Sequence, residues 1–119
     1  MANEISATVG LSCTNGNFTY NKQYSIRADQ ATSGGGNPGT ISVTTTEATV
    51  GFGSISAPRW TLFRNIGTNP VNIGAGTALV SFAQLKAGEA MVVPLVPSVT
   101  VRVQTTTGTT KLQVESMET

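Results

Sequence analysis

The sequence predicts an all-β protein, a single-domain β-sandwich or jelly-roll-like barrel of about eight short antiparallel strands. Charged residues make up only 11% of the 119 residues, against about a quarter in typical domains, so surface helices would lack their usual Lys, Glu and Arg. Thr, Ser, Asn, Gln and Gly are abundant instead, and this composition favours strands and turns. Finally, several short segments alternate apolar and polar residues, and turn residues separate them at short intervals.

The first two strands are predicted from an alternating pattern on each side of a turn. The segment "TNGN" (14–17) contains the Asn-Gly pair that is typical of a tight hairpin turn. The period of two before this turn predicts a half-buried strand, and a second strand follows the turn. The apolar positions are Ile5, Ala7, Val9 and Leu11 before the turn, and Phe18, Tyr20, Tyr24, Ile26 and Ala28 after it.

Residues 31–39, "ATSGGGNPG", are predicted to form a flexible loop, because they offer no side chain that can pack. A β-rich segment follows at 40–52, with Ile41 and Val43 on one face. We therefore expect one domain over residues 1–119, with a flexible N-terminus and a glycine-rich loop at 31–39.

The segment "APRWTLFRNIGTNPVNIGAG" (57–76) is predicted to be the central hairpin of the sandwich. A strand around Trp60 leads into a turn at Gly67–Pro70, and Val71 and Ile73 belong to the partner strand. The turn contains no basic residue and precedes no helix, so we interpret it as a chain reversal rather than a ligand site.

The remaining strands are predicted from shorter patterns. Residues 77–85 are compatible with a strand or a single helical turn. Pro94 cannot donate a hydrogen bond to a sheet, so a strand over 90–95 should lie at an edge or end near this residue. Further on, the residues expected to alternate or to point inward are Val99, Val101, Val103, Leu112 and Val114.

The chain lacks the groups that most enzymes use. It contains no His and one Cys, which excludes Ser-His-Asp and Cys-His arrangements and a structural zinc site within one chain. None of the carboxylates lies in the aromatic context of a sugar cleft, as a glycosidase would require; they are Glu4, Asp29, Glu47, Glu89, Glu115 and Glu118. We expect no enzymatic activity, and no catalytic, metal or cofactor site.

One motif resembles a dinucleotide fingerprint, but its context argues against that function. "GGGNPG" (34–39) matches the glycine spacing, yet the fingerprint must follow a buried strand and open a helix. Pro38 interrupts the motif and a Thr-rich strand follows it. We therefore expect no nucleotide cofactor and no small-molecule substrate.

Charge and targeting signals restrict the partners further. The net charge is +1, so no basic field indicates nucleic acid or an anionic membrane. The start "MANEISATVG" lacks the basic and apolar regions of a signal peptide, and we expect synthesis in a reducing cytoplasm. Cys13 cannot form an intrachain disulfide, and we interpret it as a small apolar side chain near the end of the first strand.

Four residues are candidates for contacts with a partner: Phe63, Arg59, Arg64 and Pro70. Trp60 and Leu62 share one face of their strand and Phe63 takes the other. The chain itself or another subunit would cover Phe63, and the sequence does not choose between them. Arg59 and Arg64 flank the strand, but aromatic residues are too sparse for a platform that stacks single-stranded nucleic acid.

In residues 29–95 a glycine loop leads to "TTTE" (44–47) and a Phe-Gly turn (52–53), and then to an aromatic-x-Leu-x-x-Asn strand that ends in Val-x-Ile-Gly. The positions that match this last part are Trp60, Leu62, Asn65, Asn69, Val71, Ile73 and Gly74, and Leu85, Ala87, Gly88 and Glu89 carry a Leu-x-Ala-Gly-Glu step. This series of motifs resembles a group of small virion proteins of tailed bacteriophages. This chain has Arg59 where the group often has Gly, and Pro70 where it tends to have an aromatic residue.

The resemblance implies a structural protein of the phage particle. Its expected role is capsid decoration: a homotrimer that binds the major capsid protein on the outer shell, after synthesis in the host bacterial cytoplasm. An alternative is a receptor- or glycan-binding module at a tail or fibre tip, for which Tyr20, Tyr24 and Trp60 are the aromatic candidates. A third is a minor structural part of the tail or baseplate.

Overall fold

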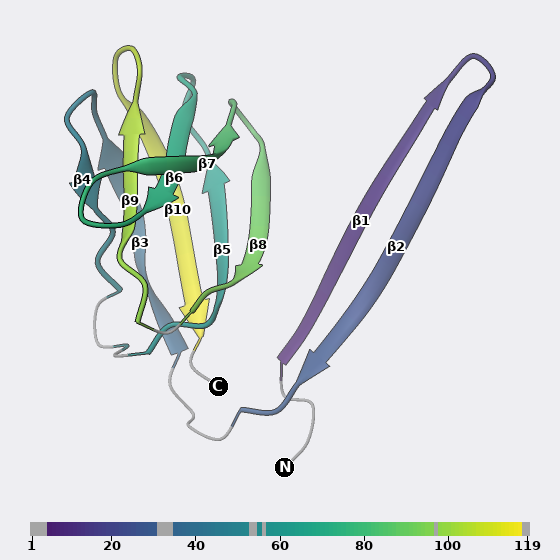
Figure 1. Cartoon of the computed structure of the whole chain (residues 1–119), viewed down its shortest axis with the longest axis horizontal. Coiled ribbons are helices and arrows are strands. Elements are labelled where there is room, and N and C mark those ends of the chain that lie inside the picture. Colours follow the sequence, from purple (N-terminus) through teal and green to yellow (C-terminus); the bar gives the residue numbers. More distant parts are fainter. Residues whose placement is uncertain (1–4, 31–34, 53–54, 56, 97, 118–119) are drawn as a thin grey trace. The chain divides into compact units, whose positions relative to one another are not determined.

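A computed structural model describes residues 5–30, 35–52, 55, 57–96 and 98–117, and it is all-β in this part of the chain. The strands are β1 (Ile5–Asn15), β2 (Phe18–Ala28), β3 (Gly35–Val43), β4 (Ala48–Thr49), β5 (Trp60–Asn65), β6 (Val71–Ala75), β7 (Val80–Leu85), β8 (Ala90–Pro94), β9 (Val101–Thr105) and β10 (Thr110–Met117). They form two compact units, one containing β1 and β2 and the other containing β3 to β10 (Figure 1).

The first unit is a two-stranded antiparallel hairpin. Asn15 pairs with Phe18, so the loop consists of Gly16 and Asn17, and Gly16 has a φ of 59°. A residue without a Cβ adopts this left-handed conformation without strain, which explains why the Asn-Gly segment turns here. The turn predicted at 14–17 is confirmed.

Burial along the hairpin differs from the prediction. Ile5 and Ala7 are buried, but Val9 and Leu11 are exposed although they continue the same alternation. The prediction of a half-buried strand is therefore wrong beyond Ala7. Alternation shows that a strand has an apolar face, but it does not show that this chain covers that face.

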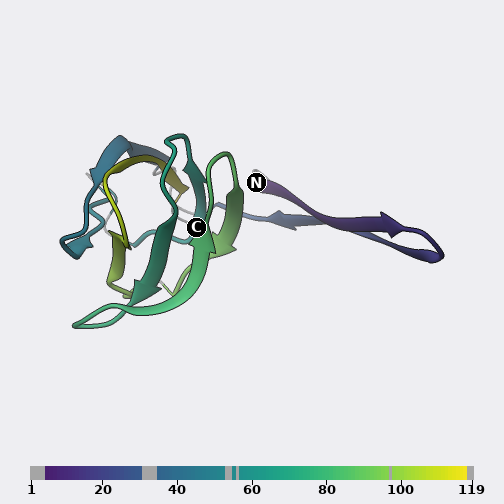
Figure 2. The same cartoon turned by 90° about the horizontal axis from the view of Figure 1, so that it is seen from above.

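The second unit is a β-sandwich of eight strands, which confirms the predicted architecture; the hairpin of the first unit brings the described strands to ten. One sheet has the order β3-β10-β5-β8 and the other β4-β9-β6-β7, and all strand pairs are antiparallel. Figure 2 shows the strands of this unit arranged around its interior. The inner faces supply a single core: Val43, Val50, Phe63, Val71, Ile73, Leu85, Leu95, Val101, Val103, Leu112 and Val114.

The expected central hairpin is wrong, because β5 and β6 lie in different sheets. The connection over residues 66–70 passes from one sheet to the other. The side-chain amide of Asn65 donates hydrogen bonds to the carbonyl oxygens of Asn69 (2.8 Å) and Leu85 (2.9 Å). These bonds tie the end of β5 to the beginning of β6 and the end of β7 across the sandwich, so the turn residues join two layers rather than two paired strands.

The glycine-rich segment also differs from its prediction. Residues 31–34 lie outside the described residues, but 35–39 begin β3, which pairs with β10 at the edge of its sheet. The register shifts between Gly39 and Gly36, so Asn37 and Pro38 lie at an irregularity where the missing N–H of proline is tolerated. Pairing by main-chain groups needs no side chain, which is why a glycine run can form this strand.

The later strands agree well with the sequence. Residues 80–85 form a strand rather than a helical turn, and Pro94 is the last residue of the edge strand β8, as expected. Val101, Val103, Leu112 and Val114 are buried. At these positions the apolar residues of the alternating pattern lie on the strand face that the rest of the sandwich covers.

Gly74 provides a test of the packing between β6 and β7. A Cβ at this position would overlap the carbonyl oxygen of Val80, a main-chain atom that cannot swing aside. We expect Gly74→Ala to destabilise the sandwich by about 1–3 kcal/mol, the usual range for overpacking. Urea unfolding followed by the fluorescence of Trp60 measures the loss.

The control for Gly74→Ala is Gly51→Ala, because a Cβ at Gly51 would meet no atom within 4 Å. We expect the control to change the free energy of unfolding by less than about 0.5 kcal/mol. Equal effects of the two substitutions would contradict the packing at Gly74.

Candidate interaction surfaces

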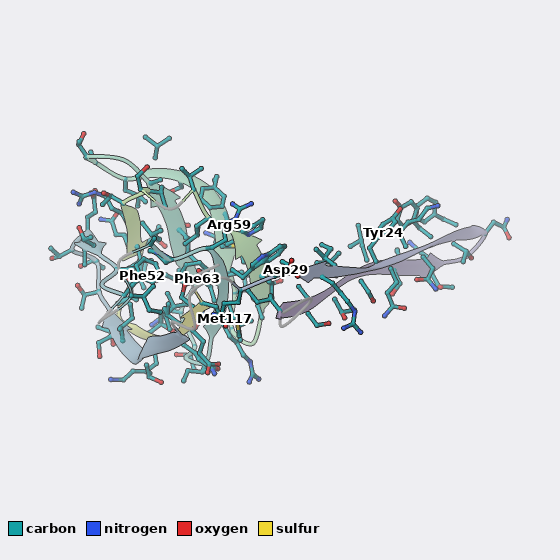
Figure 3. The ribbon with its side chains drawn as sticks, turned by 90° about the horizontal axis from the view of Figure 1, so that it is seen from below. Tyr24, Asp29, Phe52, Arg59, Phe63 and Met117 are labelled. Carbon is teal, nitrogen blue, oxygen red and sulfur yellow. The ribbon has the colours of Figure 1, made fainter. Side chains whose placement is uncertain are left out.

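The side chain of Phe63 lies in the core of the sandwich and has 0% exposure. Figure 3 shows it enclosed among the side chains of this unit. Of the two alternatives left by the sequence, the structure has the chain covering Phe63. A contact between Phe63 and another subunit would require the two sheets to separate, so Phe63 is a core residue rather than part of an interface.

The other three candidates do not form a common site. Arg59 is half-buried, and its Nη1 donates a hydrogen bond to the carbonyl oxygen of Leu95 (2.8 Å). Arg64 is exposed near the other end of β5, roughly 16 Å away along the strand at about 3.3 Å per residue. Pro70 is half-buried in the connection between the sheets. Arg64 is thus the accessible charged residue of the four candidates.

An apolar patch lies on the outer face of the sheet that contains β5. Trp60 pairs with Pro94 on one side and with Met117 on the other, and Leu62 pairs with Val92. Directly opposed residues in antiparallel strands point to the same face. Trp60 and Leu62 are half-buried, and the other three are exposed. We call these five residues the Trp60 patch.

A longer apolar surface covers one face of the hairpin. Alternate residues of β1 and β2 point to this face, and they pair as Val9 with Tyr24, Leu11 with Lys22, and Cys13 with Tyr20. We call this surface the hairpin face. Its exposed or partly exposed members are Val9, Leu11, Cys13, Phe18, Tyr20, Lys22, Tyr24 and Ile26.

The opposite face of the hairpin is polar. It consists of Ser, Thr, Asn, Gln, Gly and one Arg: Ser6, Thr8, Gly10, Ser12 and Thr14 on β1, and Thr19, Asn21, Gln23, Ser25 and Arg27 on β2. All of these residues are exposed. The hairpin is therefore amphipathic, and its apolar side is the one that water should disfavour.

The hairpin face is hollowed in two neighbouring places. One depression is lined by Val9, Gly10, Leu11, Tyr20, Lys22 and Tyr24. The other is lined by Leu11, Cys13, Phe18 and Tyr20. Cys13 is thus an exposed thiol on an apolar surface. The sequence had led us to interpret it only as a small apolar side chain near the end of the first strand.

The edge strand β7 presents a smaller apolar group. Val80 and Phe82 are 72% and 61% exposed, whereas Leu85 of the same strand is buried. Two exposed side chains are a common feature of protein surfaces and do not indicate a partner by themselves.

Glu47 and Glu89 connect loops and turns of the sandwich. Glu47 accepts hydrogen bonds from Arg102 Nη1 and from the backbone N–H of Leu79, each at 2.9 Å. Arg102 Nε also donates to the carbonyl oxygen of Gly76 (2.8 Å). Glu89 accepts a hydrogen bond from the backbone N–H of Lys86 (2.7 Å) and so closes the turn before β8. These carboxylates have structural partners within the chain.

Among the described residues, no three His, Cys, Asp or Glu side chains lie together as metal ligands. No helix long and apolar enough to span a bilayer occurs there.

The aromatic residues considered for a glycan site lie on two units. Tyr20 and Tyr24 are on the same face of β2, two pairs apart, and Trp60 is on β5. Sequence reasoning found the alternation that produces the hairpin face, but it assigned that face to the core. The available signal was the length of the two alternating runs, 11 residues each in the structure, which exceeds typical sandwich strands of about 5–6 residues.

Comparison of the chain with protein-family models, with curated proteins and with solved structures finds no match.

Proposed function

We propose that the chain is a non-enzymatic structural protein of a tailed-phage particle, and that it decorates the capsid. In this role a homotrimer binds the major capsid protein on the outer surface of the shell and stabilises the contacts between neighbouring capsid subunits. The observation that carries the proposal is the hairpin face, an extended apolar surface that the described part of this chain leaves exposed. Large exposed apolar surfaces mark sites of association.

The rest of the surface supports an assembly role. The Trp60 patch adds a second apolar area on a different unit, and the net charge of +1 provides little repulsion between crowded copies. A chain with two contact surfaces can bind its own copies through one and a shell through the other. The specific assignment to a phage capsid is supported by the resemblance of residues 29–95.

Multivalency explains how such a protein would hold a shell. Three linked copies bind three equivalent sites, so the second and third contacts form at a high effective concentration. A modest apolar contact at each Trp60 patch would then become a strong attachment. The shell gains buried apolar area across its subunit joints, which opposes the pressure of packaged DNA.

The depression between Tyr20 and Tyr24 favours one rival, a glycan- or receptor-binding module at a tail or fibre tip. Aromatic side chains beside a polar group are suitable for binding a sugar, and Lys22 lies at this depression. A minor structural role in the tail or baseplate is the third alternative. The three functions differ most simply in the number and place of the copies in the particle.

The proposal predicts a high copy number in purified virions. Cryo-electron microscopy of the phage that encodes this chain should show density for the sandwich on the outer shell, at about one subunit per major capsid protein. Quantitative protein gels of the same particles should give the same ratio. A dozen or fewer copies, or density confined to the tail, would overturn the capsid assignment and favour the rivals.

A further inference from the structure

The hairpin has two unusual features besides its apolar face. Both strands are edges, since β1 and β2 pair only with each other among the described residues. In addition, β1 contains no charged residue and no proline over its 11 residues. Natural proteins normally protect edge strands with charges, proline, bulges or short length. An unprotected edge of this length needs a covering chain.

The size of the hairpin face is sufficient for a specific contact. Phe18, Tyr20 and Tyr24 are 41–60% exposed. With the neighbouring aliphatic side chains they present an apolar area on the order of 500 Å², at about 150–250 Å² for each fully exposed aromatic residue. Standard interfaces bury about 800 Å² per partner, a value within reach once the strand edges are included. An isolated two-stranded hairpin is marginally stable in water, so burial of this face also stabilises the unit itself.

We propose that the hairpins of three copies of this chain associate in a closed ring, with the hairpin faces inward and β1 of each copy beside β2 of the next. This inference rests on the proposed function, in which the chain acts as a homotrimer, and it names the surface that forms the trimer. A head-to-tail ring of this kind covers the apolar face and the strand edges at the same time, because closure removes edges.

Geometry favours three copies over two. Two hairpins that pack face to face would bury their apolar faces but leave both edges of each copy open. Three is the smallest number of copies for which head-to-tail contacts can enclose an interior. The polar Thr- and Ser-rich face would then point to solvent on every side, in agreement with the amphipathic pattern.

Lys22 is the only charged side chain on the hairpin face. It lies between Tyr20 and Tyr24 on the same side of β2, where aromatic rings and hydroxyl groups can interact with its ammonium group. Three copies of one positive charge near a common axis nevertheless repel each other. The ring therefore predicts that Lys22→Met tightens the association, whereas a partner that recognises Lys22 would lose affinity.

Light scattering on the purified full-length chain tests the ring. The expected mass is three times the chain mass of 12.3 kDa. Leu11→Lys should reduce it to 12.3 kDa, because it buries a second positive charge directly opposite Lys22 in the ring, whereas Leu11 is 69% exposed in the single chain and tolerates a polar group there. Thr8→Lys, on the polar face of the same strand, is the matched control and should keep the trimer mass.

The native thiol provides a second test. Cys13 is the only cysteine, and in the ring all three copies place it at the same height on the inner face. A short bismaleimide should link pairs of chains and stop at about two-thirds of the chains, because each threefold set leaves one thiol without a partner. A twofold assembly would be linked to completion, and a monomer would not be linked.

The outcomes separate this inference from the proposed function. A wild-type mass of 12.3 kDa or of twice that value, or an equal response of Leu11→Lys and Thr8→Lys, overturns the ring. Such a result would not decide whether the chain binds the capsid, because the number of copies in the virion tests that separately. It would favour a capsid protein, rather than a second copy of this chain, as the partner that covers the hairpin face. A trimer in solution with few copies in the virion would instead keep the ring and overturn the capsid role. Trp60 fluorescence verifies in each variant that the sandwich is folded.

Discussion

Phe63→Ala is expected to destabilise the sandwich by about 3–5 kcal/mol, the range observed when a fully buried aromatic side chain is truncated to alanine. The side chain is inaccessible, and it belongs to the core formed by the inner faces of both sheets. The substitution removes its transfer free energy and leaves a cavity that the close-packed strands can only partly fill. Because typical domains are stable by about 5–15 kcal/mol, a large fraction of the stability would be lost. Urea unfolding monitored by Trp60 fluorescence gives the value.

The matched control is Phe82→Ala, which removes the same atoms from a side chain that is 61% exposed. We expect it to change the free energy of unfolding by less than about 1 kcal/mol. The loss at Phe63 should also be independent of protein concentration, because it arises within one chain. A loss that diminished as the concentration rose would instead place Phe63 at a contact between subunits and contradict its position in the core.

The prediction from the sequence was most reliable where one strand face is covered by the chain itself. The alternation at Val101 and Val103, and at Leu112 and Val114, identified buried positions, and all four residues lie in the core. The same period of two at Val9 marked an exposed residue. A pattern of side chains reports which residues share a face; whether that face meets another sheet depends on contacts that are distant in the sequence.

Strand pairing was harder to predict than strand position. The segment around Trp60 and the segment at Val71 were recognised as strands, but their separation by turn residues indicated a hairpin, whereas they lie in opposite sheets. A hairpin turn and a short connection between two sheets both use Gly, Asn and Pro, because these residues adopt the backbone conformations that reverse the chain. For residues 35–39 the position of a strand was itself missed. The glycines predicted a loop, but main-chain pairing with β10 forms a strand there.

The candidate site was affected by the same limit. Phe63 was selected because an aromatic residue faced away from Trp60, and that geometry is correct. In the structure, the core residues of the sandwich itself cover Phe63. The hairpin face was visible as an alternating pattern, but only the arrangement of β1 and β2 as a unit of their own shows it to be exposed.

Asn65→Ala is expected to destabilise the sandwich by about 3–5 kcal/mol, because it removes a buried amide that joins both sheets and leaves its partners unsatisfied. Asn65 is fully buried. Its Nδ2 donates to the carbonyl oxygens of Asn69 and Leu85, and its Oδ1 accepts from Gly67 N (3.0 Å) and Thr110 Oγ1 (2.7 Å). All four hydrogen-bonding positions of the amide are therefore in use.

Two further variants determine whether these hydrogen bonds cause the loss. Asn72→Ala, the control, removes a half-buried amide with an exposed hydrogen bond to Gln84 (3.0 Å), and it should cost less than about 0.5 kcal/mol. Asn65→Asp keeps the shape and the acceptor oxygen, but it directs a carboxylate oxygen at two carbonyl groups. At neutral pH it should be at least as destabilising as Asn65→Ala, since a buried charge without a partner is strongly unfavourable. If Asn65→Asp were tolerated, the amide donors would not hold the two sheets together, and shape alone would explain why Asn65 lies at this connection.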